Sequence, residues 1–168
     1  MMVYRKTVEK GLKPAELHNA AYALLQEVLR TDWNCPEVVI EKTALGKPYI
    51  HGREDLHVSL SHTDGLVCCA VSKQPVGVDC EPLRTVPQRV LQRVCTPLEL
   101  EAIPNAPDPE MRALALWTLK ESISKKRGVG MTESFQQYEI FFEEHIPHCA
   151  GHTLKLERYK DFLIAAAE

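Results

Sequence analysis

Residues 66–81 have the sequence LVCCAVSKQPVGVDCE, and they contain the two strands around which we expect the fold to form. Residues 66–71 are almost entirely apolar, which is typical of a central strand buried on both faces. Residues 76–81 alternate instead, so Gly77, Asp79 and Glu81 share one face of the second strand. That face therefore carries two carboxylates side by side.

Hydrophobic periodicity on either side of this stretch predicts an α+β protein. Further strands are expected at residues 2–8, 37–41, 48–50, 56–61, 135–142, 152–158 and 162–167, and helices at 14–30, 86–94, 96 onward and 108–127. A strand and a helix, then several strands, then helices and strands again, is an order typical of the α+β class. Each half has one main helix and a sheet, which divides one compact unit near residue 82 into halves 1–82 and 83–168.

The composition is that of an ordinary globular protein. Of the 168 residues, 45% are hydrophobic and 26% are charged, which argues against a disordered, collagen-like or membrane protein. The net charge of −3 provides no global basic field, so we expect no nucleic-acid and no membrane partner. The N-terminus has charges where a signal peptide would be apolar, and no apolar run approaches the roughly 18 residues of a membrane span, so a cytoplasmic location is expected. The six cysteines are expected to be reduced and mostly buried.

The carboxylates of Asp79 and Glu81 are the first candidate site. Two neighbouring carboxylates repel each other unless a cation or water relieves the charge. Mg²⁺ suits such a pair, because it is usually held by one or two carboxylates and completes its shell with water and substrate phosphates. The spacing alone favours a simpler alternative, a solvated face of an edge strand. The position directly after the apolar strand argues for a functional pair.

A second candidate group lies in the expected helix 108–127. Trp117, Glu121 and Lys125 are spaced by four and share one face, with Lys120 and Ser124 in the neighbouring row. Considered alone, Glu121 and Lys125 are equally explained by an exposed helical ion pair worth about 0.3–0.5 kcal/mol, with Trp117 packed into the core. The helix by itself therefore does not indicate a function.

Together the two segments resemble the 4′-phosphopantetheinyl transferase family. That family has Gly-(Val/Ile)-Asp-x-Glu followed by Trp-(Ser/Thr)-x-Lys-Glu-(Ser/Ala)-x-x-Lys, and this chain has Gly77-Val78-Asp79-Cys80-Glu81 followed by Trp117-Thr118-Leu119-Lys120-Glu121-Ser122-Ile123-Ser124-Lys125. Three further segments are similar to family motifs: Gly46-Lys47-Pro48, Ser59-Leu60-Ser61-His62-Thr63 and Gly128-Val129-Gly130-Met131. The five motifs occur in the family's order and span about half of the chain, so chance agreement is not expected.

The resemblance implies a role for each matching residue. Asp79, Glu81 and Glu121 would hold a Mg²⁺ ion that bridges the diphosphate of coenzyme A. Lys120 and Lys125 would contact that diphosphate, and Glu121 would also act as the general base, so that Asp79, Glu121 and Lys125 form the expected catalytic group. His62 with Ser61 would bind the 3′-phosphate end of coenzyme A, and Gly46, Lys47 and Pro48 would lie on the adenine side.

The implied reaction moves the 4′-phosphopantetheine arm of coenzyme A to a serine of an apo acyl, peptidyl or polyketide carrier protein and releases adenosine 3′,5′-bisphosphate. The implied fold is a monomeric pseudo-dimer of two helix-plus-sheet halves with the site at their junction. Two alternatives stay open: a non-catalytic module of the same fold that binds coenzyme A or a carrier protein, and a metal-dependent phosphohydrolase acting on a free nucleotide.

Two parts of the sequence depart from the family pattern or lie outside it. The larger branch of the family has basic residues ahead of and within its first helix, but residues 18–22 of this chain contain no Arg or Lys. The basic residues that could take their place are Lys13, or Arg5 and Lys6. Separately, His145, His148, Cys149 and His152 have a spacing compatible with zinc. The alternative is a loop that happens to be rich in histidine.

Overall fold

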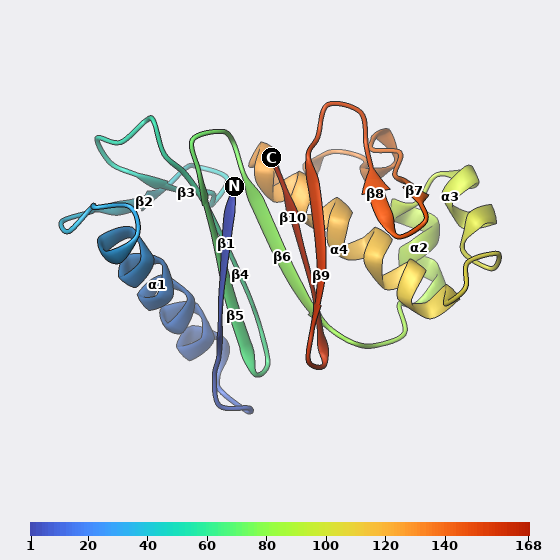
Figure 1. Cartoon of the computed structure of the whole chain (residues 1–168), viewed down its shortest axis with the longest axis horizontal. Helices are drawn as coiled ribbons and strands as arrows, with labels where there is room; N and C mark the ends of the chain where they lie inside the picture. Colours follow the sequence, from blue (N-terminus) through green and yellow to red (C-terminus); the bar gives the residue numbers. More distant parts are fainter.

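The computed structural model describes residues 1–168 except the side chain of Met131, so the last residue of the Gly128–Met131 motif lies outside the described residues. The described chain forms two helix-plus-sheet units whose sheets lie side by side, with α1 against the first sheet and α4 against the second (Figure 1). The predicted α+β class is confirmed. No helix in the described part of the chain is long and apolar enough to cross a membrane.

The first unit is a five-stranded antiparallel sheet covered by one helix. Its strands are β1 (Met2–Thr7), β2 (Ile40–Lys42), β3 (Pro48–Ile50), β4 (His57–Thr63) and β5 (Leu66–Ser72), in the order β1-β5-β4-β3-β2. Helix α1 (Pro14–Thr31) packs on one face through residues that recur at helical spacing, among them Leu17, Leu24 and Val28. Every residue of β5 is buried, so the prediction of a central strand buried on both faces is confirmed.

The second unit has a three-stranded sheet and most of the helices. Its strands are β6 (Gly77–Pro82), β9 (Leu154–Tyr159) and β10 (Phe162–Ala167), in the order β6-β10-β9. The long helix α4 (Pro109–Arg127) packs against β6 and β10, and the remaining elements are α2 (Gln88–Val94), α3 (Pro97–Ala102), the one-turn helices η1 (Gly130–Thr132) and η2 (Phe135–Gln137), and the hairpin of β7 (Phe141–Glu143) and β8 (Ile146–His148). Asp108 caps α4 by accepting the backbone N–H of Met111, with Pro109 at the first helical position.

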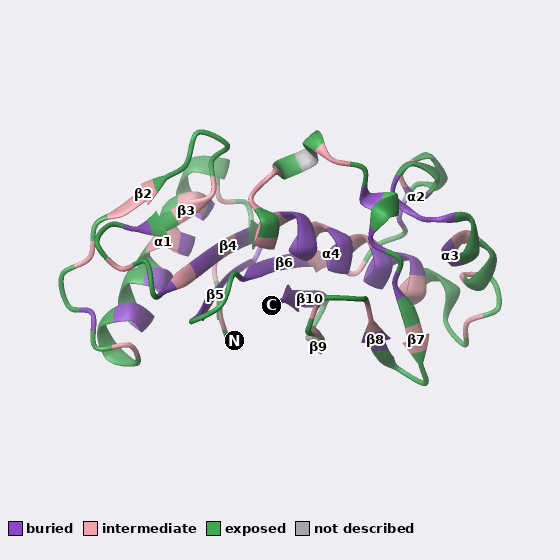
Figure 2. Ribbon diagram, turned by 90° about the horizontal axis from the view of Figure 1, so that it is seen from above, coloured by how far each residue is buried: buried purple, intermediate pink, exposed green. Residues whose placement is uncertain are grey.

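The junction between the units lies between β4 and β6. The expected division near residue 82 counts β6 with the first half, whereas β6 pairs with β10 over its whole length, from Gly77 opposite Ala167 to Pro82 opposite Phe162. On the other edge of β6, two backbone N–H groups donate to serine hydroxyls of β4. Ser59 Oγ accepts the Val78 N–H at 3.0 Å, and Ser61 Oγ accepts the Cys80 N–H at 3.2 Å. Strands β4, β5 and β6 and much of α4 form one buried band across the molecule (Figure 2).

Two of the expected strands are placed differently in the structure. The strand expected at residues 37–41 is shorter and lies at Ile40–Lys42. The strand expected at 135–142 does not form, because side chains bind the backbone groups that a neighbouring strand would need. Lys120 Nζ donates to the carbonyls of Phe135 and Tyr138, and a Glu99 carboxylate oxygen accepts the N–H of Ile140. Only the last part of that stretch enters a strand, as β7 of a hairpin.

Candidate active site

The two motif segments meet where α4 packs against β6. Gly77 makes this close approach possible, since a Cβ at that position would lie 1.9 Å from the carbonyl oxygen of Ser122 and 2.3 Å from the backbone nitrogen of Lys126. Any other residue would push the helix away from the strand. The glycine of the strand motif therefore brings Glu121 and Lys125 of α4 beside Asp79 of β6.

Asp79 is the most constrained carboxylate of the site. It is 5% exposed, and its Oδ1 accepts hydrogen bonds from Ser61 Oγ at 2.9 Å and from Lys125 Nζ at 2.7 Å. Its Oδ2 is buried and has no hydrogen-bond partner among the described residues. A buried carboxylate oxygen without a partner is costly, so this atom indicates a place for a missing ligand.

Glu81 and Glu121 complete the acidic group. Glu81 Oε1 accepts the indole N–H of Trp117 at 2.7 Å, and its Oε2 pairs with Arg84 at 3.0 Å. Trp117 thus orients a carboxylate, in addition to packing against the core of the second unit. Burial raises the pKa of Glu121 to about 7, and the negative charges of Asp79 and Glu81 contribute to the rise, while Lys125 opposes it. The three predicted carboxylates are therefore close enough to repel one another.

The donor set fits a magnesium ion, although the residues are not yet arranged as a coordination sphere. Three carboxylates are hard oxygen ligands of the kind that Mg²⁺ selects, and Asp79 Oδ2 is free to bind. In the described residues, no three His, Cys, Asp or Glu side chains are already placed to hold a metal. At this site the carboxylates have other partners: Lys125 is paired with Asp79, and Arg84 and Trp117 are bonded to Glu81.

Lys120 does not lie at this site, which corrects the prediction that it contacts the diphosphate. Its side chain is completely buried inside the second unit, where the ammonium pairs with Glu99 at 2.7 Å and donates to the carbonyls of Phe135 and Tyr138. An ammonium group has three donors, and all three are used here. Lys120 therefore has a structural role.

The side chains of Ser61 and His62 lie on opposite faces of β4, because neighbouring residues of a strand point in opposite directions. Ser61 faces the junction, and its buried hydroxyl is occupied by Asp79, Lys125 and the Cys80 N–H, so the prediction that it binds the 3′-phosphate end is not supported. His62 faces the other side and is exposed. Its pKa is lowered by partial burial and by the nearby charges of His18 and Lys125.

Residues near His62 form a group that the sequence alone did not reveal. The His18 ring lies 6.1 Å from the His62 ring and 4.6 Å from the Tyr22 ring, and Lys42 Nζ is 3.3 Å from His18 Nε2. We refer to His18, Tyr22, Lys42 and His62 as the His18 cluster. The i, i+4 spacing of His18 and Tyr22 on α1 was a usable signal, whereas Lys42 reaches the cluster from a different strand. The basic residues that could take the place of those in the family's larger branch make other contacts. Arg5 pairs with Glu157, Lys6 pairs with Glu27, and Lys13 is the N-cap residue of α1.

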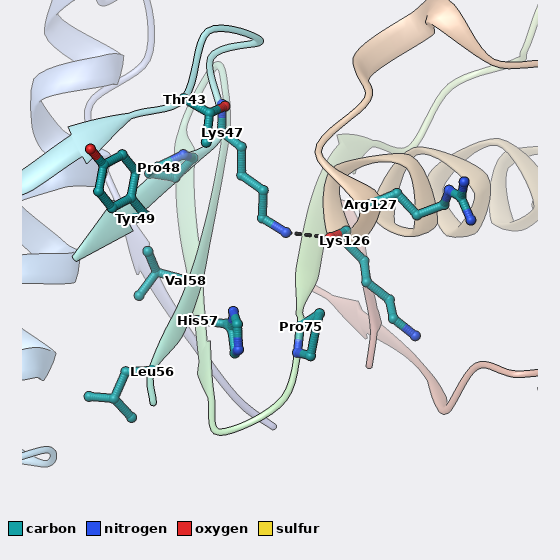
Figure 3. Close-up of a pocket in the computed structure, with 10 residues that line it drawn as sticks. All are labelled: Thr43, Lys47, Pro48, Tyr49, Leu56, His57, Val58, Pro75, Lys126 and Arg127. Carbon is teal, nitrogen blue, oxygen red and sulfur yellow. Dashed lines mark hydrogen bonds between the residues drawn. The ribbon is translucent and has the colours of Figure 1, made fainter. Parts of the chain in front are cut away.

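Lys47 and Pro48 of the Gly46-Lys47-Pro48 segment line a cavity between the two units. The cavity has a volume of about 520 Å³, and its walls include Lys47, Pro48, His57, Lys126 and Arg127 (Figure 3). Lys47 Nζ donates to the carbonyl of Lys126 near the end of α4, where a cation is favoured by the helix dipole. Burial lowers the pKa of Lys47, and the charge of Lys126 lowers it further. Lys126 directly follows Lys125, so the cavity and the carboxylates lie along the same part of α4.

The histidine-rich segment does not form a zinc site in the structure. His148 stacks on Phe141 and lies 3.7 Å from Glu143, whereas His152 is 3.1 Å from Lys126 Nζ. These contacts divide the segment between different neighbours, and in the part of the chain that the structure describes no three His, Cys, Asp or Glu side chains are placed to hold a metal. The contacts therefore favour the other interpretation, a segment that happens to be rich in histidine.

Comparison with known proteins was consistent with this geometry. A family model described as the 4′-phosphopantetheinyl transferase superfamily matches residues 75–165, more than half of the chain. A 4′-phosphopantetheinyl transferase of Bacillus subtilis is 30% identical over 98 residues, which are 56% of this chain and 43% of the relative. The 4′-phosphopantetheinyl transferase gsp of Aneurinibacillus migulanus is 30% identical over 112 residues, 64% of this chain and 46% of the relative. The chain spans about half the length of the curated relatives it matches.

Two holo-[acyl-carrier-protein] synthases of known structure are similar to part of this chain. The holo-[acyl-carrier-protein] synthase of Thermotoga maritima has a TM-score of 0.49 and 19% identity, over 55% of this chain and 61% of that chain. The corresponding synthase of Neisseria meningitidis has a TM-score of 0.49 and 20% identity, over 55% of this chain and 94% of that chain.

Proposed function

The chain belongs to the 4′-phosphopantetheinyl transferase superfamily, and from that premise we propose that it transfers the 4′-phosphopantetheine arm of coenzyme A to a serine of an apo carrier protein. The observation that carries the proposal is the group formed by Asp79, Glu121 and Lys125, in which Asp79 keeps one buried oxygen without a partner. An acidic pocket with an adjacent ammonium suits a substrate that combines a diphosphate with a divalent cation.

We propose that Asp79, Glu81 and Glu121 hold Mg²⁺ in this reaction. The ion would neutralise the negative charge that develops on the leaving phosphate. Asp79 Oδ2 and the Glu121 carboxylate are the oxygens best placed to receive it, since both Glu81 oxygens already accept hydrogen bonds. Lys125 would contact the diphosphate as a mobile point charge.

Glu121 would accept the proton of the attacking serine, directly or through a water molecule. The serine oxygen bonds to the phosphorus that carries the pantetheine, and the bond from that phosphorus to the bridging oxygen breaks to release adenosine 3′,5′-bisphosphate. The pKa of Glu121 is about 7 without metal, and a bound cation would lower it, so the carboxylate would be ionised and able to accept a proton near neutral pH.

The other end of coenzyme A would lie across the first unit. We propose that the His18 cluster receives the 3′-phosphate, because His18, Lys42 and His62 supply hydrogen-bond donors from three different elements. The cavity beside Lys47 would receive the adenine. Comparing coenzyme A with its 3′-dephospho form tests the first assignment, and equal KM values for the two would contradict it.

The proposed function is tested by incubating the chain with coenzyme A, Mg²⁺ and a panel of apo acyl, peptidyl and polyketide carrier proteins, and then measuring the mass of each carrier. A mass gain equal to the phosphopantetheine arm is expected for at least one carrier. The gain should disappear in EDTA and with a carrier whose acceptor serine is replaced by alanine.

The same experiment separates the two alternatives. Adenosine bisphosphate should appear only when an acceptor serine is present, whereas a phosphohydrolase would release phosphate or diphosphate without any carrier. Coenzyme A binding without a mass gain on any carrier would support the non-catalytic module instead.

A further inference from the structure

Lys125 supplies the positive charge beside Asp79 in the acidic site, whereas Arg84 pairs with Glu81. Its ammonium lies 2.7 Å from Asp79 Oδ1 and 2.9 Å from Ser61 Oγ. In both contacts the ammonium is the hydrogen-bond donor, as a lysine has no acceptor. Lys125 therefore places a positive charge directly against the carboxylate of Asp79.

A divalent metal at the carboxylates would bring a second positive charge to the same place. The metal would bind Asp79 Oδ2, and Lys125 is bonded to the other oxygen of that carboxylate, so the two cations would be neighbours on one small group. Like charges that close repel strongly in a partly buried site. Stable occupation by both in the present geometry is therefore unfavourable.

Lys125 is also able to leave. Its side chain keeps 32% of its surface exposed, in contrast to the complete burial of Lys120 on the same helix. A lysine ammonium sits on a flexible four-carbon chain and can rotate without moving the backbone. Asp79 would remain partly satisfied after its departure, because Ser61 still donates to Oδ1.

We propose that Lys125 is a resident counter-ion that competes with the divalent metal for Asp79 and is released towards the substrate diphosphate when the metal binds. This inference rests on the proposed metal site. In the metal-free chain Lys125 weakens metal binding and keeps the carboxylates together. Once the metal neutralises Asp79, the ammonium is free for phosphate oxygens, so metal and diphosphate favour each other's binding.

The test measures metal affinity without substrate. Mn²⁺ is titrated alone, at pH 8 and without coenzyme A, and free Mn²⁺ is followed by its paramagnetic resonance signal. Lys125→Met should bind Mn²⁺ at least about tenfold more tightly than the unmodified chain, because the competing charge is gone. Lys125→Arg keeps the charge and should stay within about threefold of the unmodified chain. Lys126→Met removes the same charge at the adjacent position, where the ammonium contacts His152 instead, and should also have little effect.

A second measurement uses the unmodified chain, so it does not depend on how well a variant folds. An amine-reactive label followed by mass spectrometry should modify Lys125 severalfold faster in Mn²⁺ than in EDTA, while the rate at Lys126 stays constant. Equal Mn²⁺ affinities for all four proteins, or unchanged labelling of Lys125, would overturn the role of Lys125 and leave the metal site standing. No Mn²⁺ binding by any of the four would overturn the metal site itself, and this inference with it.

Discussion

Two lysines on α4, five residues apart, make opposite use of an acidic partner. Lys120 is fully buried and pairs with Glu99, and its two remaining donors bind backbone carbonyls, so no donor is left unpaired. Lys125 is partly exposed, and its partner Asp79 keeps an unpartnered oxygen. We call a network closed when all of its donors and acceptors are paired, so that a ligand could bind only by breaking an existing contact. We call a network open when it keeps an unpaired buried atom that a ligand can still bind.

Glu99 shows how thoroughly the first network is closed. One of its oxygens accepts the N–H of Thr96 at 2.7 Å and also pairs with Lys120, and the other accepts the N–H of Ile140 at 2.7 Å. The same carboxylate therefore caps α3, anchors α4 and holds the chain that leads into β7. Every part of this network is internal to the second unit, whereas the Asp79 network joins the two units.

The largest expected effect comes from breaking the open network. Asp79→Ala should lower the rate of phosphopantetheine transfer by about three powers of ten or more, because it removes the carboxylate best placed to hold the metal. The fold should persist, because the hydrogen bond between Ser61 and the Cys80 N–H does not depend on Asp79. Carrier mass measured over time gives the rate, and circular dichroism checks the fold. Transfer within tenfold of the unmodified chain would remove Asp79 from the metal site.

Breaking the closed network should instead reduce the stability of the fold. Lys120→Met leaves the buried Glu99 carboxylate without its cation, and such a loss typically costs about 3–5 kcal/mol of unfolding free energy. Urea denaturation measures this cost. Lys126→Met, which removes a partly exposed lysine from the same helix, should stay within about 0.5 kcal/mol. If the two variants are equally stable, the closed network does not stabilise the fold as described.

Much of this architecture was accessible from local sequence signals. The capping box at Thr96 forms as expected, with Glu99 N–H bonded to Thr96 Oγ1 and Thr96 N–H bonded to Glu99. Helix α4 begins after Asp108 and ends at Gly128, whose φ of 72° is the left-handed conformation that favours glycine. The convergence of strand and helix motifs was expected from the family resemblance. These features depend on residues close together in the sequence or on motifs with a known arrangement.

The misplaced features depend on contacts between distant residues. Four consecutive residues of α4, Ala113 to Leu116, are buried, so the helix is enclosed on most sides and periodicity cannot tell which face holds the site. Lys120 was assigned to the diphosphate from the family resemblance alone, and the pattern of the helix gave no signal that its side chain is buried against Glu99. The strand expected at 135–142 failed because Lys120 and Glu99, both far away in the sequence, bind its backbone groups. Propensity predicts a strand there, and tertiary hydrogen bonds override it.

A smaller effect should distinguish the two serines that join β4 to β6. Ser61→Ala and Ser59→Ala each leave one buried N–H of β6 without its acceptor, which should cost about 1–2 kcal/mol of unfolding free energy in both variants. Only Ser61 also donates to Asp79, so only Ser61→Ala should reduce transfer, by about tenfold in kcat/KM. Denaturation and steady-state kinetics supply the two numbers. Equal kinetic losses in the two variants would show that Ser61 has no special effect on Asp79.

The smallest expected effect is on stability, because the ionised Glu121 of the open network destabilises the fold. Burial and the nearby charges of Asp79 and Glu81 raise the pKa of Glu121 from 4.5 to about 7, so the folded chain favours the protonated carboxyl. That preference stabilises the fold below pH 4.5 and is lost as the pH rises through 7. Glu121→Gln mimics the protonated form. In EDTA at pH 8 it should stabilise the chain by about 1 kcal/mol, once solvent screening of the part-exposed group is allowed for, which is a rise of about 2–4 °C in Tm.

Most of that gain should disappear by pH 5, where the unmodified Glu121 is itself protonated in the folded chain. Glu133→Gln is the control of opposite sign. A hydrogen bond from Arg127 lowers the pKa of Glu133, so removing its charge should slightly destabilise the chain at pH 8 rather than stabilise it. Thermal unfolding of the three proteins across this pH range gives the comparison. A Glu121→Gln variant that is less stable at pH 8, or a gain that does not change with pH, would mean that Glu121 carries no unrelieved charge, and the acidic site would then have no need of a metal.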